Sequence, residues 1–77
     1  MEGPLIRAAG LRKRSVTLAG HATSLALEPE FWAALDAMAQ AQSVSLAALL
    51  ARIDDGRGKR TLASACRVAA LEFAQAD

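Results

Sequence analysis

Two stretches of alternating polar and apolar residues lie in the N-terminal third of the chain. Residues 15–18 alternate and include β-branched side chains, and residues 21–28 alternate again, which predicts two strands. In the second strand Thr23, Leu25 and Leu27 share one face. Because a shift of one residue would turn both leucines to water, we expect a well-fixed register. The two strands form either a hairpin or two separate extended pieces.

After these strands the apolar residues recur at the spacing of an α-helix. Apolar residues recur one turn apart over residues 30–41 and again over residues 46–53, which predicts two amphipathic helices. Pro29 suits the first turn of the first helix. Ser45 is a good N-cap for the second.

A loop and a third helix complete the pattern. Residues 54–60 include two glycines and predict a loop, after which Thr61 or Ser64 caps a helix that runs to about residue 74. The main apolar face of this helix carries Leu62, Cys66, Ala69 and Phe73. Val68 and Leu71 lie well away from that face. A helix that is apolar on two sides is usually buried between two surfaces, so we expect another subunit to cover the second side.

The chain is short for its apolar content. It has 77 residues, of which 53% are apolar, and a lone core in so small a domain is marginal. We therefore expect one domain over residues 12–77, whose core unit, residues 22–53, closes by pairing with a second copy. Residues 1–11 have no clear period and contain two glycines and a proline, which predicts a flexible arm.

The composition argues against several classes of protein. The N-terminus lacks the features of a secretory signal, and no run of about 20 apolar residues exists, so we expect a cytoplasmic bacterial protein without a membrane partner. Cys66 is the only cysteine and is expected in the core, and Trp32 is expected in the core or at a dimer contact rather than as a platform for base stacking. His21 is the only histidine and is expected in a turn. These residues give no metal site, and we expect no cofactor, no catalytic residues and no enzymatic activity.

Basic residues form two clusters on either side of an acidic middle. Residues 1–27 carry four basic side chains and one acidic (+3), residues 28–55 one basic and five acidic (−4), and residues 56–77 four basic and two acidic (+2). This pattern suits an anionic partner. Ordinary solvated surface charge is the alternative.

The order of elements over residues 22–53 resembles the ribbon-helix-helix domains of the Arc and MetJ repressors. Residues 13–32 read KRSVTLAGHATSLALEPEFW and are similar to the opening of a small ribbon-helix-helix family common in alphaproteobacteria. Later blocks of that family resemble Val44-Ser45-Leu46, Ile53-Asp54 and residues 62–68. The resemblance covers about residues 12–74.

This resemblance implies a mostly α fold with a short N-terminal β-ribbon, arranged as an intertwined homodimer, to which this chain adds a third C-terminal helix. In such a dimer one strand from each subunit pairs into the ribbon, and the helices interlock beneath it. The implied dimer core consists of Leu25, Leu27, Phe31, Leu35, Leu46, Leu49, Leu50 and Ile53.

The resemblance also implies DNA binding by a small transcriptional regulator, because a β-ribbon can present its outer side chains to bases in the major groove. The residues expected to contact DNA are Arg12, Lys13, Arg14, Ser15, Thr17, Ser24, Ser43 and Ser45. We expect the first six on the outer face, with Ser43 and Ser45 holding phosphate at a helix N-terminus. Ala22 and Ala26 on that face offer no hydrogen bond, so a protein-interaction module is the alternative.

Overall fold

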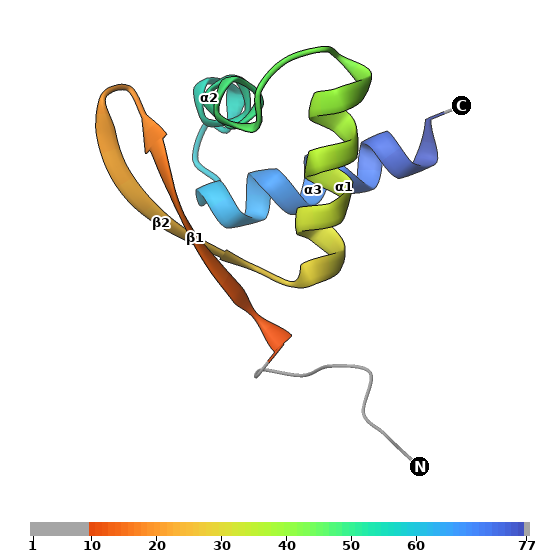
Figure 1. The fold of residues 1–77 in the computed structure, drawn as a ribbon, viewed down its shortest axis with the longest axis horizontal. Helices are drawn as coiled ribbons and strands as arrows, with labels where there is room; N and C mark the ends of the chain where they lie inside the picture. The colour runs from red at the N-terminus through yellow and green to blue at the C-terminus, as the bar shows by residue number, and fades with distance from the viewer. Residues whose placement is uncertain (1–9, 77) are drawn as a thin grey trace.

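The computed structural model describes residues 10–76 as an antiparallel hairpin that lies along one side of three helices (Figure 1). The elements in chain order are β1 (Arg12–Leu18), β2 (His21–Leu27), α1 (Pro29–Ala41), α2 (Leu46–Gly56) and α3 (Leu62–Gln75). The arm expected over residues 1–11 lies outside the described residues except for Gly10 and Leu11. Within residues 10–76 no single helix is long and apolar enough to cross a membrane, and α1 and α2 meet that test only as a pair bent by 102°.

A tight turn joins the two strands. Its two residues, Ala19 and Gly20, have φ values of 52° and 82°, the pattern of a type I′ turn, whose twist matches that of the flanking strands. The hairpin is therefore the correct one of the two alternatives, and β1 begins three residues earlier than predicted. His21 was expected in the turn, but it is the exposed first residue of β2, opposite Leu18.

The ribbon forms within a single chain. Residues pair antiparallel from Arg12 with Leu27 to Leu18 with His21. A two-residue turn makes this pairing local and keeps the entropy of loop closure small. The expected ribbon in which each strand comes from a different subunit stays a prediction. Each strand has one neighbour in the sheet, so its other edge has no strand partner within residues 10–76.

The inner face of the hairpin and the three helices enclose one core. Its largest fully buried side chains are Leu27, Leu35, Leu50 and Cys66. The remaining buried core residues include Leu18, Leu25, Trp32, Met38 and Leu49. Burying a leucine or tryptophan side chain contributes roughly 1.5–3 kcal/mol, so this cluster is the main source of stability. The expected positions of Cys66 and Trp32 are confirmed.

A single chain already buries most of the residues expected in a dimer core. Five of the eight, Leu25, Leu27, Leu35, Leu49 and Leu50, are buried, whereas Phe31, Leu46 and Ile53 are half-buried against them. β1 and α3 cover residues 22–53 from within the same chain, and the pairing of this unit with a second copy stays a prediction.

The helix ends follow the capping chemistry of the sequence. The Ser45 hydroxyl accepts a hydrogen bond from the Ala48 amide at 3.0 Å, which confirms it as the N-cap of α2. Thr61, rather than Ser64, caps α3, because its hydroxyl accepts from the Ser64 amide at 3.1 Å. At the end of α1, Ser43 has a φ of 57° and the Val44 amide donates to the Ala39 carbonyl, the pattern of a Schellman motif.

Two expectations for the C-terminal half need correction. Residues 54–56 belong to α2 rather than to the loop, and Gly58, at a φ of 60°, lies in the shorter connection that follows. Phe73 was expected on the core face of α3 but is 37% exposed. The C-terminal end of α3 extends beyond α1 (Figure 1), so little of the molecule covers this ring.

Candidate nucleic-acid interface

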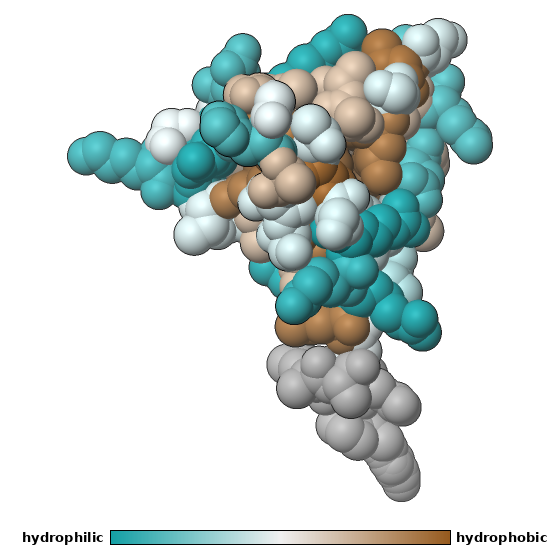
Figure 2. Space-filling model, turned by 60° about the vertical axis from the view of Figure 1, so that its left-hand side comes forward, coloured by the Kyte–Doolittle hydropathy of each residue, from teal (hydrophilic) through white to brown (hydrophobic). Residues whose placement is uncertain are grey.

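The outer face of the hairpin collects small and polar side chains. Partners across an antiparallel pair lie on the same face, so the register defines this face. It consists of Lys13 opposite Ala26, Ser15 opposite Ser24, and Thr17 opposite Ala22. All are exposed except Ala26, which is half-buried. Hydrophilic and intermediate residues cover much of this side of the molecule (Figure 2).

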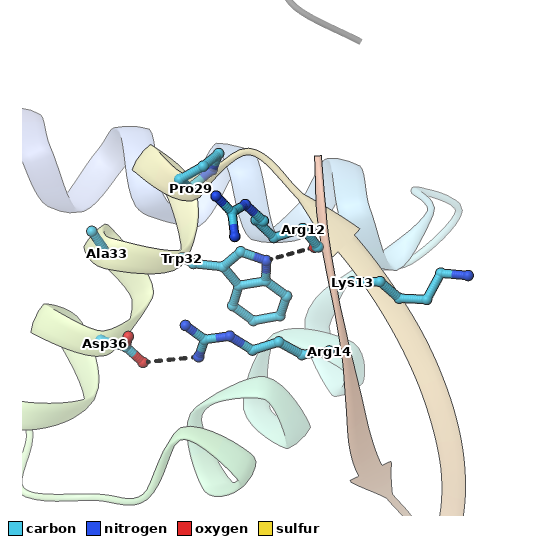
Figure 3. A pocket seen from close by; sticks show the side chains of 7 residues that line it. All are labelled: Arg12, Lys13, Arg14, Pro29, Trp32, Ala33 and Asp36. Atoms are coloured by element: carbon cyan, nitrogen blue, oxygen red, sulfur yellow. Dashed lines mark hydrogen bonds and ion pairs between the residues drawn. The ribbon is translucent and has the colours of Figure 1, made fainter. Parts of the chain in front are cut away.

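The inner face takes the other two basic residues of β1. Arg12 and Arg14 lie opposite Leu27 and Leu25, and both side chains extend toward Trp32 and α1 while Lys13 points away (Figure 3). The expectation that Arg12 and Arg14 line the outer face is therefore wrong. Successive residues of a strand point to opposite faces, so three consecutive basic residues cannot share one.

Arg14 is held by two contacts with α1. Its guanidinium carbon lies 4.4 Å from the centre of the Trp32 ring, a cation–π distance. One of its nitrogens lies 3.5 Å from a carboxylate oxygen of Asp36 (Figure 3). These contacts orient Arg14 and compensate part of its charge, so it joins β1 to α1.

Trp32 completes this junction. Its indole Nε1 donates a hydrogen bond of 2.9 Å to the Arg12 carbonyl, and its ring is only 2% exposed. A surface hollow of about 460 Å³ lies beside it, and its lining includes Arg12, Arg14 and Asp36 (Figure 3). Since the indole donor is already satisfied, its main role is to fix the position of β1, and with it the outward direction of Lys13.

Ser43 and Ser45 lie away from the hairpin, in the connection between α1 and α2. The Ser45 hydroxyl is occupied as the N-cap of α2, and Ser43 closes the end of α1. The amides of Leu46 and Ala47 can bind an anion here, because first-turn N–H groups have no acceptor within their own helix. Both serines are exposed, so this helix end is open to solvent.

Sequence reasoning missed the roles of two other arginines. Arg67 of α3 contacts Glu28 through Nε at 3.0 Å and through a second nitrogen at 2.9 Å, and its guanidinium carbon lies 5.7 Å from the Phe31 ring centre. A backbone hydrogen bond at Glu28 and the bond from Arg67 lower the pKa of the Glu28 carboxyl. Arg57 contacts Asp54 at 2.7 Å and the Arg60 carbonyl at 2.7 Å. Glu28 is distant from Arg67 in the sequence, so only the structure reveals that contact. Asp54 and Arg57 are three residues apart, and the structure shows that their side chains meet.

The remaining candidates for chemistry are structural. Burial raises the pKa of the Cys66 thiol to about 11, which removes the thiolate needed for nucleophilic attack at neutral pH. Within residues 10–76 no group of three or more His, Cys, Asp or Glu side chains is placed to hold a metal ion. The polar outer face of the hairpin is thus the feature of this fold best suited to recognition.

A two-stranded ribbon with a polar outer face above a helical core is the architecture of a small groove-binding domain. The family model for the ribbon-helix-helix domain matches residues 11–74, from the start of the hairpin to the last turn of α3. The chain therefore belongs to the ribbon-helix-helix domain family, as its resemblance indicated. Proteins of this family generally bind DNA as dimers in transcription regulation. Neither curated proteins nor solved structures give a match.

Proposed function

We propose that this chain is a DNA-binding protein, a small transcriptional regulator that acts as a homodimer on DNA in the cytoplasm. In this proposal the outer face of the β1–β2 hairpin enters the major groove. The observation that supports it is the gathering of Lys13, Ser15, Thr17 and Ser24 on one exposed face. No catalysis is involved.

The dimensions of the hairpin suit this role. Its two strands are separated by about 4.8 Å, as in any sheet, and a major groove about 12 Å wide admits a two-stranded ribbon. On the outer face of the hairpin, β2 carries two alanines and one serine. On the same face β1 carries a lysine that can contact guanine or phosphate, and two hydroxyls that can contact either type of base pair.

Two further groups are available for phosphates beside the groove. Arg12 is exposed, and no ion pair among residues 10–76 includes its guanidinium. The amides of Leu46 and Ala47 add the positive end of the α2 dipole. Such contacts carry no sequence information but fix the register of the protein on the duplex.

A protein-interaction module is the second candidate function. Ala22 and Ala26 weaken the outer face as a reader of bases, and Arg14 is committed to Trp32 and Asp36. Among residues 10–76 each strand also has an edge without a strand neighbour, to which an extended peptide can add. In that case the hairpin would dock protein rather than DNA.

Binding to random-sequence duplex DNA across a salt series tests the proposal. We expect measurable affinity at low salt that falls linearly on a logarithmic plot as salt rises, because phosphate contacts release counterions. The variant Lys13→Ala/Ser15→Ala/Thr17→Ala should bind more weakly with a shallower salt slope. Lys59→Ala, which removes the same charge from the connection between α2 and α3, is the matched control. Absence of binding at low salt would contradict the proposal and favour the protein-interaction module.

A further inference from the structure

We infer that a small organic phosphate binds in the surface hollow between β1 and the N-terminal half of α1. The hollow lies beside Trp32, on the side of the hairpin that faces α1 (Figure 3). It is therefore on the other side of β1 from the proposed DNA-binding face, and the site does not depend on DNA binding. The size, the charge and the lining of the hollow determine the class of ligand.

The hollow is large enough for an organic molecule. Its volume is about 460 Å³, within the range of roughly 300–1,000 Å³ for small-molecule sites in proteins. Pro29 and Ala33, both exposed, give it an apolar wall on α1, and Trp32 closes the wall with a ring that is only 2% exposed. An inorganic ion would leave most of this space and the apolar wall unused. The ligand that fits therefore has a small uncharged body as well as a charged group.

Two guanidinium groups supply the positive charge of the hollow. Arg12 and Arg14 are alternate residues of β1, about 7 Å apart along the strand, so both side chains extend toward α1 from the same face (Figure 3). Within residues 10–76 the Arg12 guanidinium joins no ion pair. Lys13 lines the margin, but its ammonium points away (Figure 3). The hollow thus favours an anion held mainly by the two arginines.

Asp36 is the carboxylate that faces this site, and it weakens the site for an anion. Its contact with Arg14 is long, at 3.5 Å, and the two side chains are about half exposed, so the pair contributes little to stability. Arg14 carries five N–H donors, and an incoming anion can share them with Asp36. Because the Asp36 charge opposes that of the ligand, its removal should strengthen binding.

A phosphate suits this pair of arginines better than a carboxylate does. A guanidinium binds an oxyanion through two parallel N–H···O bonds, and the two oxygens of a carboxylate match one such group. A phosphate monoester has three acceptor oxygens and a charge of about −1.5 to −2 at pH 7. It can therefore accept hydrogen bonds from Arg12 and Arg14 together, while the body of the ligand rests on Pro29 and Ala33.

Trp32 is the only tryptophan of the chain and reports binding directly. The full chain is titrated with adenosine 5′-monophosphate (AMP) at constant ionic strength. The tryptophan fluorescence should change, because an anion that draws Arg14 away alters the surroundings of the indole ring. Adenosine and inorganic phosphate are titrated in parallel as the two halves of the probe. We expect a dissociation constant of about 1 mM or lower for AMP, and binding of either half that is weaker by about tenfold or more.

Three variants test the residues, with isothermal titration calorimetry as a second readout. Arg12→Gln should weaken AMP binding by about tenfold or more, because it removes charge-assisted hydrogen bonds. Asp36→Asn should strengthen AMP binding by about fivefold, because it removes an opposing charge. A loss of structure could not produce this gain. Lys59→Gln removes a positive charge from the connection between α2 and α3, so it is the matched control and should leave the affinity unchanged.

Equal affinities for AMP and adenosine would overturn the inference, and so would an unchanged affinity in Arg12→Gln or a weaker one in Asp36→Asn. Inorganic phosphate that binds as tightly as AMP would also overturn it, since the hollow would then hold an ion only. Duplex DNA without terminal phosphates offers phosphate from a nucleic acid instead. A response to the duplex without a response to AMP would assign the hollow to the DNA backbone. The inference would then fail while the proposed function stands.

Discussion

Lys13 and Arg14 are adjacent and both basic, yet they occupy opposite faces of the same strand. The Arg14 guanidinium stacks on Trp32 and contacts Asp36, whereas Lys13 points outward beside Ser24 and Ala26 (Figure 3). The difference shows that the period of two in a strand, rather than the local density of charge, decides what each basic residue does.

The same division separates the whole hairpin into a structural face and a recognition face. The inner face carries Leu18, Leu25 and Leu27 into the core, and the outer face carries only small, hydroxyl and lysine side chains. Substitutions on the inner face should therefore change the free energy of unfolding. Those on the outer face should change binding and leave stability nearly unaltered.

The largest effect is expected for Leu27→Ala. Leu27 is fully buried, and truncation of a buried leucine costs about 2–5 kcal/mol because it loses apolar contact and leaves a cavity. Ser24→Ala, an exposed change on the other face, should lie within about 0.5 kcal/mol of the unaltered protein. Urea unfolding followed by circular dichroism measures both. Similar losses for the two variants would refute the division into faces.

A smaller loss of stability is expected for Arg14→Ala. It removes a cation–π contact and an exposed ion pair, which together contribute about 1 kcal/mol. Because Arg14 packs on Trp32, the tryptophan fluorescence of the folded protein should change as well. Lys13→Ala should alter neither the urea midpoint nor the fluorescence. An equal effect of the two substitutions would contradict the different placement of these residues.

The Glu28–Arg67 contact predicts a loss of stability in acid. The pKa of Glu28 is lower in the folded chain than its ordinary value of 4.5, so the folded state favours the ionised carboxylate. This contribution is complete above the ordinary value and is lost as pH falls through the folded pKa. The difference in unfolding free energy between the unaltered protein and Glu28→Gln should therefore shrink as pH falls below about 4.5. A difference that is constant with pH would exclude this linkage.

The smallest effect is a gain, expected for Ala19→Asn. Ala19 adopts a φ of 52°, which costs an ordinary L-residue free energy, whereas asparagine tolerates this region and Asn-Gly favours a type I′ turn. We expect an increase of about 0.5–1 kcal/mol in unfolding free energy. Ala22→Asn, on the strand, is the control and should give no gain. A loss of stability in Ala19→Asn would indicate that the turn differs from type I′.

Much of the fold can be predicted from the sequence. Alternation marks both strands, helical spacing marks all three helices, and Ser45 and Thr61 cap helices as their side chains allow. These features are local, so nearest neighbours along the chain determine them. The buried positions of Trp32 and Cys66 follow from the same periodicity.

The partner of the second strand could not be predicted in this way. Alternation defines the two faces of a strand but not which strand pairs with it, and Ala19-Gly20 is a weaker hairpin signal than Asn-Gly. The inward position of Arg14 depends on β1 beginning at Arg12, earlier than its β-branched residues indicate. Phe73 illustrates a third limit, since the exposure of a helix end depends on how far it extends past its neighbours.

The most direct test of the two-face account compares the salt dependence of DNA affinity for Lys13→Ala and Arg14→Ala. Both variants lose one positive charge from adjacent positions, so bulk charge affects them equally. We predict that Lys13→Ala lowers the slope of log affinity against log salt by about one for each hairpin in contact with DNA. Arg14→Ala should keep nearly the full slope. Equal slopes for the two variants would contradict the assignment of the outer face as the DNA-binding surface.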